Sequence, residues 1–446
     1  MASLKSSSRV SPTSETSKSL KARLARGAAG AFVINMGGTG LAFLSQLVLA
    51  RVLGVEGYGI YAYVIAWVTI LGLLATLGFH TALLRFASAY RVRSEWALLR
   101  GLIRYAEIRV LTAGLAIGVI GAAAVVGLGD RLRPELVRTF QVGFAIVPVL
   151  ALLQLRSSTV RAFGGVISAI APQNLVRSAT VLLIVAVAGL VLGWQLAPSS
   201  AMAAMLLGTA LGLALVTLAL RRRRPAQVTT TAVEQQARLW RQTALPLLFL
   251  AAMQALLARI DILILGYVVD TTSAGIYVAA SRAAALVAFA LTAVNMIFAP
   301  NIAALHARGA SPALQAMVTT TARWTTISGL AIAVPLLVLA PIVLAAFGDA
   351  FTSGATALRI LLLGQIVNAA TGSVGNLLTM TGHERYAAVI LGIAAVGQVG
   401  LCAILIPPFG MEGAAIATAA TMIGWNIAMA VFVWRNLRIV PSILAP

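Results

Sequence analysis

The stretch that decides the fold is residues 49–91, which read LARVLGVEGYGIYAYVIAWVTILGLLATLGFHTALLRFASAYR. A short glycine-containing turn around Gly54 leads into an apolar run at 58–78. About 20 consecutive apolar residues match the thickness of the hydrocarbon core of a bilayer. Another apolar run, 28–50, precedes the turn, and Arg85 follows the second run. The stretch therefore predicts two membrane-spanning helices joined by a tight turn.

The composition of the whole chain indicates the same class of protein. Of its 446 residues, 60% are hydrophobic and 10% are charged, whereas soluble domains carry roughly a quarter charged residues. Apolar runs recur from end to end and leave almost no chain for a soluble domain. One cysteine, Cys402, excludes an intramolecular disulfide and a thiolate metal site. We predict an all-α polytopic membrane protein.

Hydropathy predicts twelve spans, because a backbone exposed to lipid must satisfy its own hydrogen bonds. Twelve spans make two halves of six helices each. The predicted spans are residues 28–50, 58–78, 107–128, 140–163, 171–193, 201–220, 245–268, 275–299, 324–347, 355–380, 386–406 and 413–434.

The connections between these spans alternate in charge. One set, which includes the N-terminal tail and the segment from Arg221 to Arg241, carries 24 basic residues, and the opposite set carries 4. Basic residues concentrate on the cytoplasmic side of membrane proteins, so both termini are expected there. The same rule explains the net charge of +21 without a nucleic-acid partner. The run Arg221–Arg224 is expected to fix the topology and to favour anionic lipid.

The chain divides accordingly into five parts. The first 27 residues hold eight serines and six basic residues, which is typical of a disordered tail. The predicted organisation is a basic cytoplasmic tail at 1–27, a six-helix half at 28–220, a cytoplasmic linker at 221–244, a second six-helix half at 245–435 and a C-terminal cytoplasmic tail at 436–446.

An internal repeat supports the two halves. Leu53-Gly54 is followed by Gly59-Ile60-Tyr61, and Leu265-Gly266 is followed by Gly275-Ile276-Tyr277. Each triplet lies where an even-numbered helix begins, after an outward turn. Six helices is an even number, so the halves are parallel repeats, a plan in which cargo binds between rocking halves. The glycines themselves are expected to serve close helix packing.

The repeat also carries a family resemblance. The turn Ala50-Arg51-Val52-Leu53-Gly54, the helix start Gly59-Ile60-Tyr61, Leu77-Gly78 and Arg85 resemble the opening of the polysaccharide transporter (Wzx-type) family. Residues 260–282 resemble the seventh and eighth helices of that family. The family belongs to the superfamily that contains multidrug exporters (MATE) and lipid II flippases. The resemblance implies a flippase for a polyprenyl-diphosphate-linked glycan in the cytoplasmic membrane of bacteria.

A charged residue deep in the bilayer indicates a structural or functional role, because each such charge costs about 2.5–3.5 kcal/mol on insertion scales. Asp261 and Arg282 lie at equal predicted depth on neighbouring helices, so a structural ion pair between them is one interpretation. Arg259 then has no acidic partner, and its planar fork suits a diphosphate. Arg282 is an alternative contact for that diphosphate. Asp261, the only deep carboxylate, is the candidate for coupling to an ion gradient.

Other polar residues have competing interpretations. Arg85 either anchors the topology or makes the first contact with the lipid diphosphate on the cytoplasmic side. Amides inside the spans, with Asn295 and Asn368 as candidates, either join helices or form a polar cavity for sugar hydroxyls. Three arginines near predicted helix ends can snorkel to the membrane surface. These are Arg51, Arg177 and Arg359.

Several functional classes remain open at this point. No G-x-x-x-x-G-K-[ST] motif and no metal or Ser/His/Asp spacing occurs, so we expect no cofactor, no metal and no enzymatic activity. A drug or metabolite exporter is the main alternative, but two deep arginines against one aspartate favour anionic cargo. A membrane glycan polymerase or ligase is less favoured, because the outward loops are short. The expected partners are the lipid-linked oligosaccharide, membrane lipids, and the polymerase and glycosyltransferases of the same pathway.

Overall fold

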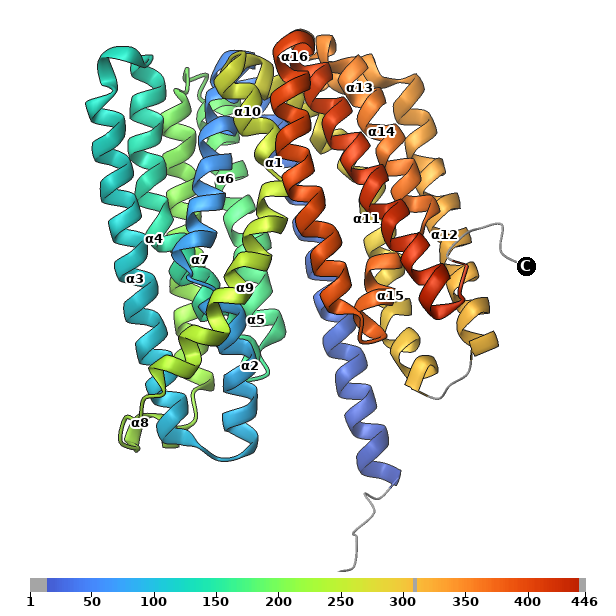
Figure 1. Ribbon diagram of the computed structural model, residues 1–446. Coiled ribbons are helices and arrows are strands. Elements are labelled where there is room, and N and C mark those ends of the chain that lie inside the picture. Colours follow the sequence, from blue (N-terminus) through green and yellow to red (C-terminus); the bar gives the residue numbers. More distant parts are fainter. Residues whose placement is uncertain (1–13, 308–310, 441–446) are drawn as a thin grey trace, which may run out of the picture.

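The computed structural model describes residues 14–307 and 311–440, and the described residues contain helices and connecting turns but no strand (Figure 1). The side chains of residues 14–29, 31–33 and several residues between 290 and 311, Asn295 among them, lie outside the description.

The helices follow one another with short connections. Short 3-10 and π-helical turns lie at η1 (Gly129–Arg131), η2 (Pro172–Val176), η3 (Ala186–Val191) and η4 (Asp349–Gly354). The α-helices are α1 (Ser14–Ala75), α2 (Phe79–Val92), α3 (Trp96–Gly127), α4 (Pro134–Ala162), α5 (Val166–Ala171), α6 (Arg177–Val185), α7 (Pro198–Arg223), α8 (Ala226–Thr230), α9 (Ala237–Leu257), α10 (Ile260–Val268), α11 (Thr271–Ala307), α12 (Ser311–Val338), α13 (Ala340–Ala345), α14 (Ala355–Ala370), α15 (Val374–Met380) and α16 (Glu384–Leu437).

The two longest helices, α1 and α16, are each two antiparallel spans. Each contains one glycine at positive φ, Gly54 (φ 67°) and Gly410 (φ 53°), where the helix reverses. Tyr58 donates a hydrogen bond to Gln46, 12 residues earlier, at 2.9 Å, although a straight helix would separate them by about 18 Å. The turns need glycine because side-chain-bearing residues rarely adopt this conformation.

The predicted number of spans is confirmed. Among the described residues, nine helices are long and apolar enough to cross a membrane, and α9 with α10 forms a further span bent by 54°. Counting α1 and α16 as two spans each gives twelve. The largest difference from the sequence-based boundaries lies at the N-terminus, where α1 begins at Ser14 and not at residue 28.

The spans form two bundles that meet at one end of the molecule (Figure 1). Helices α2–α7 lie on one side and α11–α16 on the other, and α1 runs between them. Helix α9 crosses from one to the other. Trp240 near its start is buried and donates a hydrogen bond to Tyr90 of α2 at 3.0 Å, and it contacts the ring of Tyr105 of α3. The first two turns of the seventh span therefore pack on the first half.

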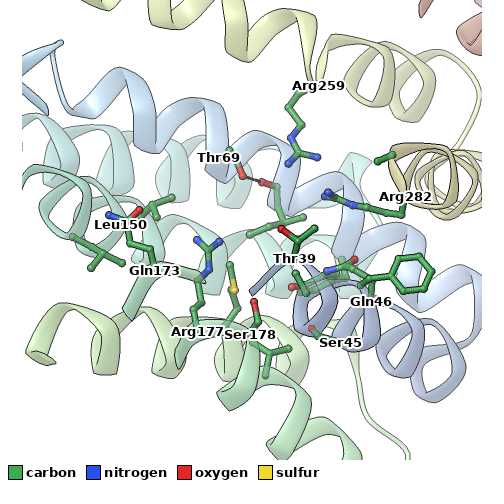
Figure 2. Close-up of a pocket in the computed structure, with 18 of the residues that line it drawn as sticks. Thr39, Ser45, Gln46, Thr69, Leu150, Gln173, Arg177, Ser178, Arg259 and Arg282 are labelled. Atoms are coloured by element: carbon green, nitrogen blue, oxygen red, sulfur yellow. Dashed lines mark hydrogen bonds between the residues drawn. The ribbon is translucent and has the colours of Figure 1, made fainter. Parts of the chain in front are cut away.

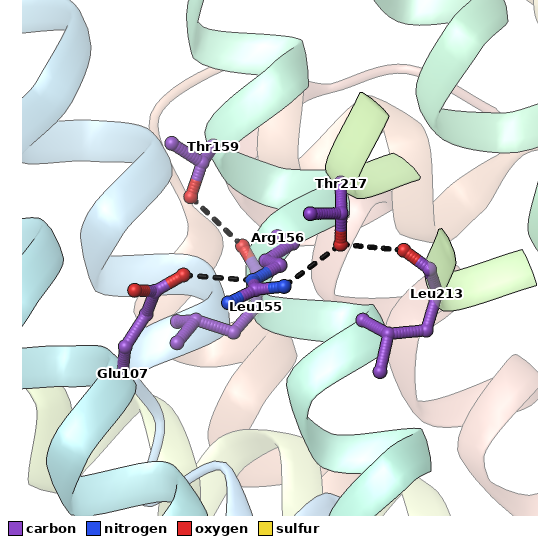
Figure 3. A network of polar contacts seen from close by, with 6 residues as sticks. All are labelled: Glu107, Leu155, Arg156, Thr159, Leu213 and Thr217. Atoms are coloured by element: carbon purple, nitrogen blue, oxygen red, sulfur yellow. Dashed lines mark hydrogen bonds and ion pairs between the residues drawn. The ribbon is translucent and has the colours of Figure 1, made fainter. Parts of the chain in front are cut away.

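A polar network fastens three helices of the first half (Figure 3). Arg156 of α4 pairs with Glu107 of α3 at 2.8 Å and donates a hydrogen bond to Thr217 of α7 at 2.7 Å. Leaving a charge unpaired in such a place would be costly. Arg156 is therefore a structural arginine, because a carboxylate and a hydroxyl of the same bundle are its partners.

The repeat triplets meet where the two bundles converge. A Cβ on Gly59 would overlap the carbonyl oxygen of Thr271, and one on Gly275 would lie 2.6 Å from the Cα of Gly59. The Nε of the exposed Arg51 donates to the carbonyl oxygen of Ala346 at 2.6 Å. The ring of Tyr58 also packs against Phe351, with centroids 5.7 Å apart. These contacts close one end of the space between the halves.

Candidate functional site

A cavity of about 430 Å³ lies between the two halves. This volume is within the range of roughly 300–1,000 Å³ that is typical of small-molecule sites. Helices α1, α4, α6 and α7 and the π-helical turn η2 contribute from the first half. Helix α11 and Arg259, which directly precedes α10, contribute from the second. Its polar lining residues are Thr39, Ser45, Gln46, Thr69, Gln154, Gln173, Arg177, Ser178, Arg259 and Arg282, together with the ring of Tyr61.

Three arginines dominate this cavity, and local backbone features place two of them. Arg259 lies at the break between α9 and α10, with φ −145° and ψ −15°. Arg177 begins α6 directly after the π-helical turn that starts at Pro172; such turns are frequent at functional sites. Arg282 projects from α11. Figure 2 shows the three guanidinium groups pointing toward one space from different sides. We call this space the arginine cavity.

The three guanidinium groups are unpaired within the part of the chain that the structure describes. None of them forms an ion pair or a hydrogen bond there; the ion pairs that do form are Arg156–Glu107 and Arg133–Glu56. A guanidinium stays charged and offers a planar fork of donors that fits phosphate oxygens. Three such groups around one cavity provide donors and positive charge, and so favour an anionic ligand with several oxygens.

The ion pair that the sequence suggested between Asp261 and Arg282 does not form. Asp261 is buried in the second half, where Tyr277 of α11 donates to its carboxylate at 2.6 Å and Thr418 of α16 at 3.0 Å. The backbone N–H of Ile262 donates a third hydrogen bond at 2.8 Å. The rotation of the two helices turns Arg282 into the cavity, whereas Asp261 faces Tyr277 and Thr418.

This arrangement makes a prediction about stability. Changing Asp261 to alanine removes the 2.6 Å acceptor of the buried Tyr277 hydroxyl and leaves it only the longer contact with Thr418 at 3.1 Å. A buried group left unsatisfied costs roughly 1–3 kcal/mol. Thermal unfolding in detergent should therefore begin at a lower temperature. Adding Arg282→Ala should not restore stability, because the two residues share no contact and their effects should add. Recovery in the double variant would show that they pair after all. The exposed Asp130→Ala is the matched control, because the carboxylate of Asp130 forms no hydrogen bond among the described residues.

Of the other candidate residues, Arg85 and Asn368 lie outside the arginine cavity. Arg85 is exposed on α2. Asn368 belongs to a hydrogen-bonded cluster within the second half, where Asn426 donates to it at 3.2 Å and Thr371 donates to Asn426 at 3.0 Å. This is the helix-joining role that was one of its two interpretations. Asn295 is in α11, and its side chain lies outside the described residues.

Sequence reasoning missed several polar lining residues in the first half, of which one arginine and two amides are the most informative. Arg177, which was expected to snorkel, lines the arginine cavity together with Gln154 and Gln173. A signal was present in the sequence: Pro172 interrupts an apolar run and is followed at once by Gln173, with Arg177 four residues further on. Residues four apart share a helix face, so a polar face within the span could have been recognised.

The fold and this site define a membrane transporter with a cationic cavity between two six-helix halves. The family model for polysaccharide biosynthesis proteins matches residues 24–306. The chain therefore belongs to that family. A search of curated proteins gave no significant match.

Solved structures with the same fold are transporters of the MOP superfamily. An inward-facing multidrug resistance MATE family transporter aligns with a TM-score of 0.74 at 15% identity, over 92% of this chain and 98% of that chain. An outward-facing multidrug resistance MATE family transporter aligns with a TM-score of 0.64 at 15% identity, over 92% and 95%. A MOP superfamily transporter from Pyrococcus furiosus, described as having a binding pocket of reverse polarity, gives 0.65 at 16% identity, over 92% and 95%. These likenesses show that the chain has the same fold.

Proposed function

We propose that this chain is a flippase that moves a polyprenyl-diphosphate-linked oligosaccharide across the cytoplasmic membrane of bacteria by alternating access. The observation that carries the proposal is the arginine cavity, whose three guanidinium groups have no partner among the described residues. A diphosphate supplies the missing negative charge and the acceptor oxygens. Membership of the polysaccharide biosynthesis family supports a glycan as the remainder of the cargo.

The orientation follows from the distribution of basic residues. The helix ends near α8 and near the α2–α3 turn are rich in basic residues, so we assign them to the cytoplasm under the positive-inside rule. The contact between Gly59 and Gly275 then closes the outer side. In this state the arginine cavity is loaded from the cytoplasm, where the lipid-linked glycan is made. The glycosyltransferases and the polymerase of the pathway are the proposed functional partners.

A smaller cavity between α1 and α11 gives the lipid tail a lateral route. It has a volume of about 190 Å³, is lined by Met36 and Phe289 among others, and shares Thr39 with the arginine cavity. A polyprenyl chain remains in the apolar phase, because moving it into water would cost about 0.8 kcal/mol for each CH₂ group. The diphosphate can therefore occupy the arginine cavity while the tail stays between the two helices in lipid.

Asp261 is the proposed ion-coupling group. It is the deep carboxylate of the chain, and its hydrogen bonds join α10, α11 and α16. Gaining or losing a cation there would change the contacts among these three helices, all of which belong to the second half. An ion gradient can drive transport only if the ion binds one conformation of the protein more tightly than the other.

Two other functions compete with this proposal. A MATE-like exporter of drugs or metabolites shares the fold, and this alternative is supported by the same structural matches. Cationic drugs, however, would be repelled by three uncompensated arginines. An enzyme of glycan polymerisation is disfavoured by the transporter fold.

Reconstitution of the purified chain into lipid vesicles tests the proposal. Vesicles are prepared with a polyprenyl-diphosphate-linked glycan on the inner leaflet, and the glycan that reaches the outer leaflet is captured by a lectin. Capture should increase with time in vesicles that contain the protein and not in protein-free vesicles. A cationic dye serves as the competing cargo. Transport of the dye without movement of the glycan would establish the exporter and overturn the flippase proposal.

A further inference from the structure

A second cavity of about 200 Å³ adjoins the arginine cavity within the first half. It is lined by His80 of α2, by Ser157, Ser158 and Arg161 of α4, and by Gln154 and Gln173. Gln154 and Gln173 line both cavities, so the two spaces are neighbours. Arg161 lies one residue before the end of α4 and His80 is the second residue of α2. The second cavity therefore lies on the side from which the proposed cargo is loaded.

Ser157 gives this cavity a group that lacks a partner. Its side chain is only 3% exposed, and its hydroxyl oxygen forms no hydrogen bond. A serine within a helix commonly satisfies its hydroxyl on the carbonyl four residues earlier. Thr159 on the same helix does so, donating to Leu155 at 3.0 Å. Burying a hydroxyl without a partner is unfavourable, and a ligand in the cavity would remove that penalty.

The second cavity is lined mainly by amides and hydroxyls, with one guanidinium group, that of Arg161, at its edge. Amides and hydroxyls can both donate and accept hydrogen bonds, as sugar hydroxyls do. Three guanidinium groups can only donate, as a diphosphate requires. The Nδ1 of His80 lies 2.8 Å from the hydroxyl of Thr76, which fixes the imidazole ring beside the cavity. The described residues that line it include no carboxylate.

We propose that this second cavity is a sugar subsite, which binds through hydroxyl groups the sugar attached directly to the diphosphate. The inference rests on the proposed function, because it assumes that the diphosphate occupies the arginine cavity. It assigns the two parts of the cargo to two different cavities. The arginine cavity binds the diphosphate, which all such lipids share, and the second cavity recognises the first sugar.

Two purified probes test the subsite, a short-chain polyprenyl diphosphate without sugar and the same lipid carrying one hexose. Binding of each probe to the full chain in detergent is measured by the shift in thermal unfolding and by titration of tryptophan fluorescence. In the variant that combines Ser157→Ala with Ser158→Ala, affinity for the glycosylated probe should fall about tenfold, as expected for the loss of two hydrogen bonds. Affinity for the bare diphosphate should not change.

The control variants separate this proposal from the proposed function. Ser88→Ala alters an exposed serine of α2 and should affect neither probe. Arg259→Ala should weaken both probes alike. Equal loss of both probes in the double serine variant, or no loss of either, overturns the sugar subsite and leaves the flippase proposal intact. If wild-type protein binds neither probe, or if Arg259→Ala weakens neither, the diphosphate site itself is wrong and both proposals fail.

Discussion

Replacing Arg259 with alanine is expected to lower glycan transport about 10- to 100-fold while the amount of folded protein stays near normal. A hydrogen bond to a charged group contributes about 1.5–3 kcal/mol, and 1.4 kcal/mol corresponds to a factor of ten. The protein should fold normally, because Arg259 has no ion-pair or hydrogen-bond partner among the described residues that its loss would strand. Transport is measured by lectin capture in reconstituted vesicles, and folded protein by its elution as a single species in detergent.

The series at this position distinguishes charge from geometry. Lysine keeps the charge but loses the planar fork, so Arg259→Lys should restore transport only in part. Arg259→Glu should be the most damaging change, because it repels the diphosphate inside a site of low dielectric. Arg359→Ala is the matched control, since Arg359 is exposed and donates to the carbonyl oxygen of Leu337 at 3.3 Å. Normal transport by stably expressed Arg259→Ala would remove Arg259 from the site.

Hydropathy was sufficient to predict the twelve spans, because lipid imposes the same requirement on every spanning backbone. The turn at Gly54 was also readable from sequence, since a reversal within a few residues requires a positive φ that favours glycine. Hydropathy does not predict the rotation of each helix about its axis, and so does not predict which side chains face the cavity. Depth alone therefore suggested an ion pair between Asp261 and Arg282 that the structure replaces with hydrogen bonds from Tyr277 and Thr418.

The arginine cavity was only partly predictable for the same reason. Arg259 and Arg282 stood out because they lie deep within predicted spans, whereas Arg177 lies near a predicted helix end, where snorkelling is the ordinary explanation. The π-helical turn from Pro172 to Val176 changes the direction in which the side chains after it point, Arg177 among them. Average hydropathy does not detect such a change in the number of residues per turn. The repeat triplets were identified correctly, but that Gly59 faces Gly275 depends on how the two halves dock.

The second large effect is expected at this contact between the repeats: Gly59→Val should abolish transport. Any Cβ at residue 59 would overlap the carbonyl oxygen of Thr271, and the opposing atoms are backbone, so they cannot move aside as the end of a flexible side chain could. Overpacking costs about 1–3 kcal/mol even where side chains can adjust. The state with the outer side closed would therefore lose at least about fivefold in population relative to the open state, and the larger valine should exclude it.

Cysteine accessibility reports which state each variant adopts. The native Cys402 is first changed to alanine, and Gln46, which lines the arginine cavity, is changed to cysteine as the reporter. With Gly59 intact, a membrane-impermeant thiol reagent should label the reporter from the cytoplasmic side; in Gly59→Val it should label from the outer side. Gly392→Val is the matched control, because nothing lies within 4 Å of the position that its Cβ would take. Transport at the normal rate by Gly59→Val, with labelling still cytoplasmic, would show that the contact between Gly59 and Gly275 is not the closure that alternates during the cycle.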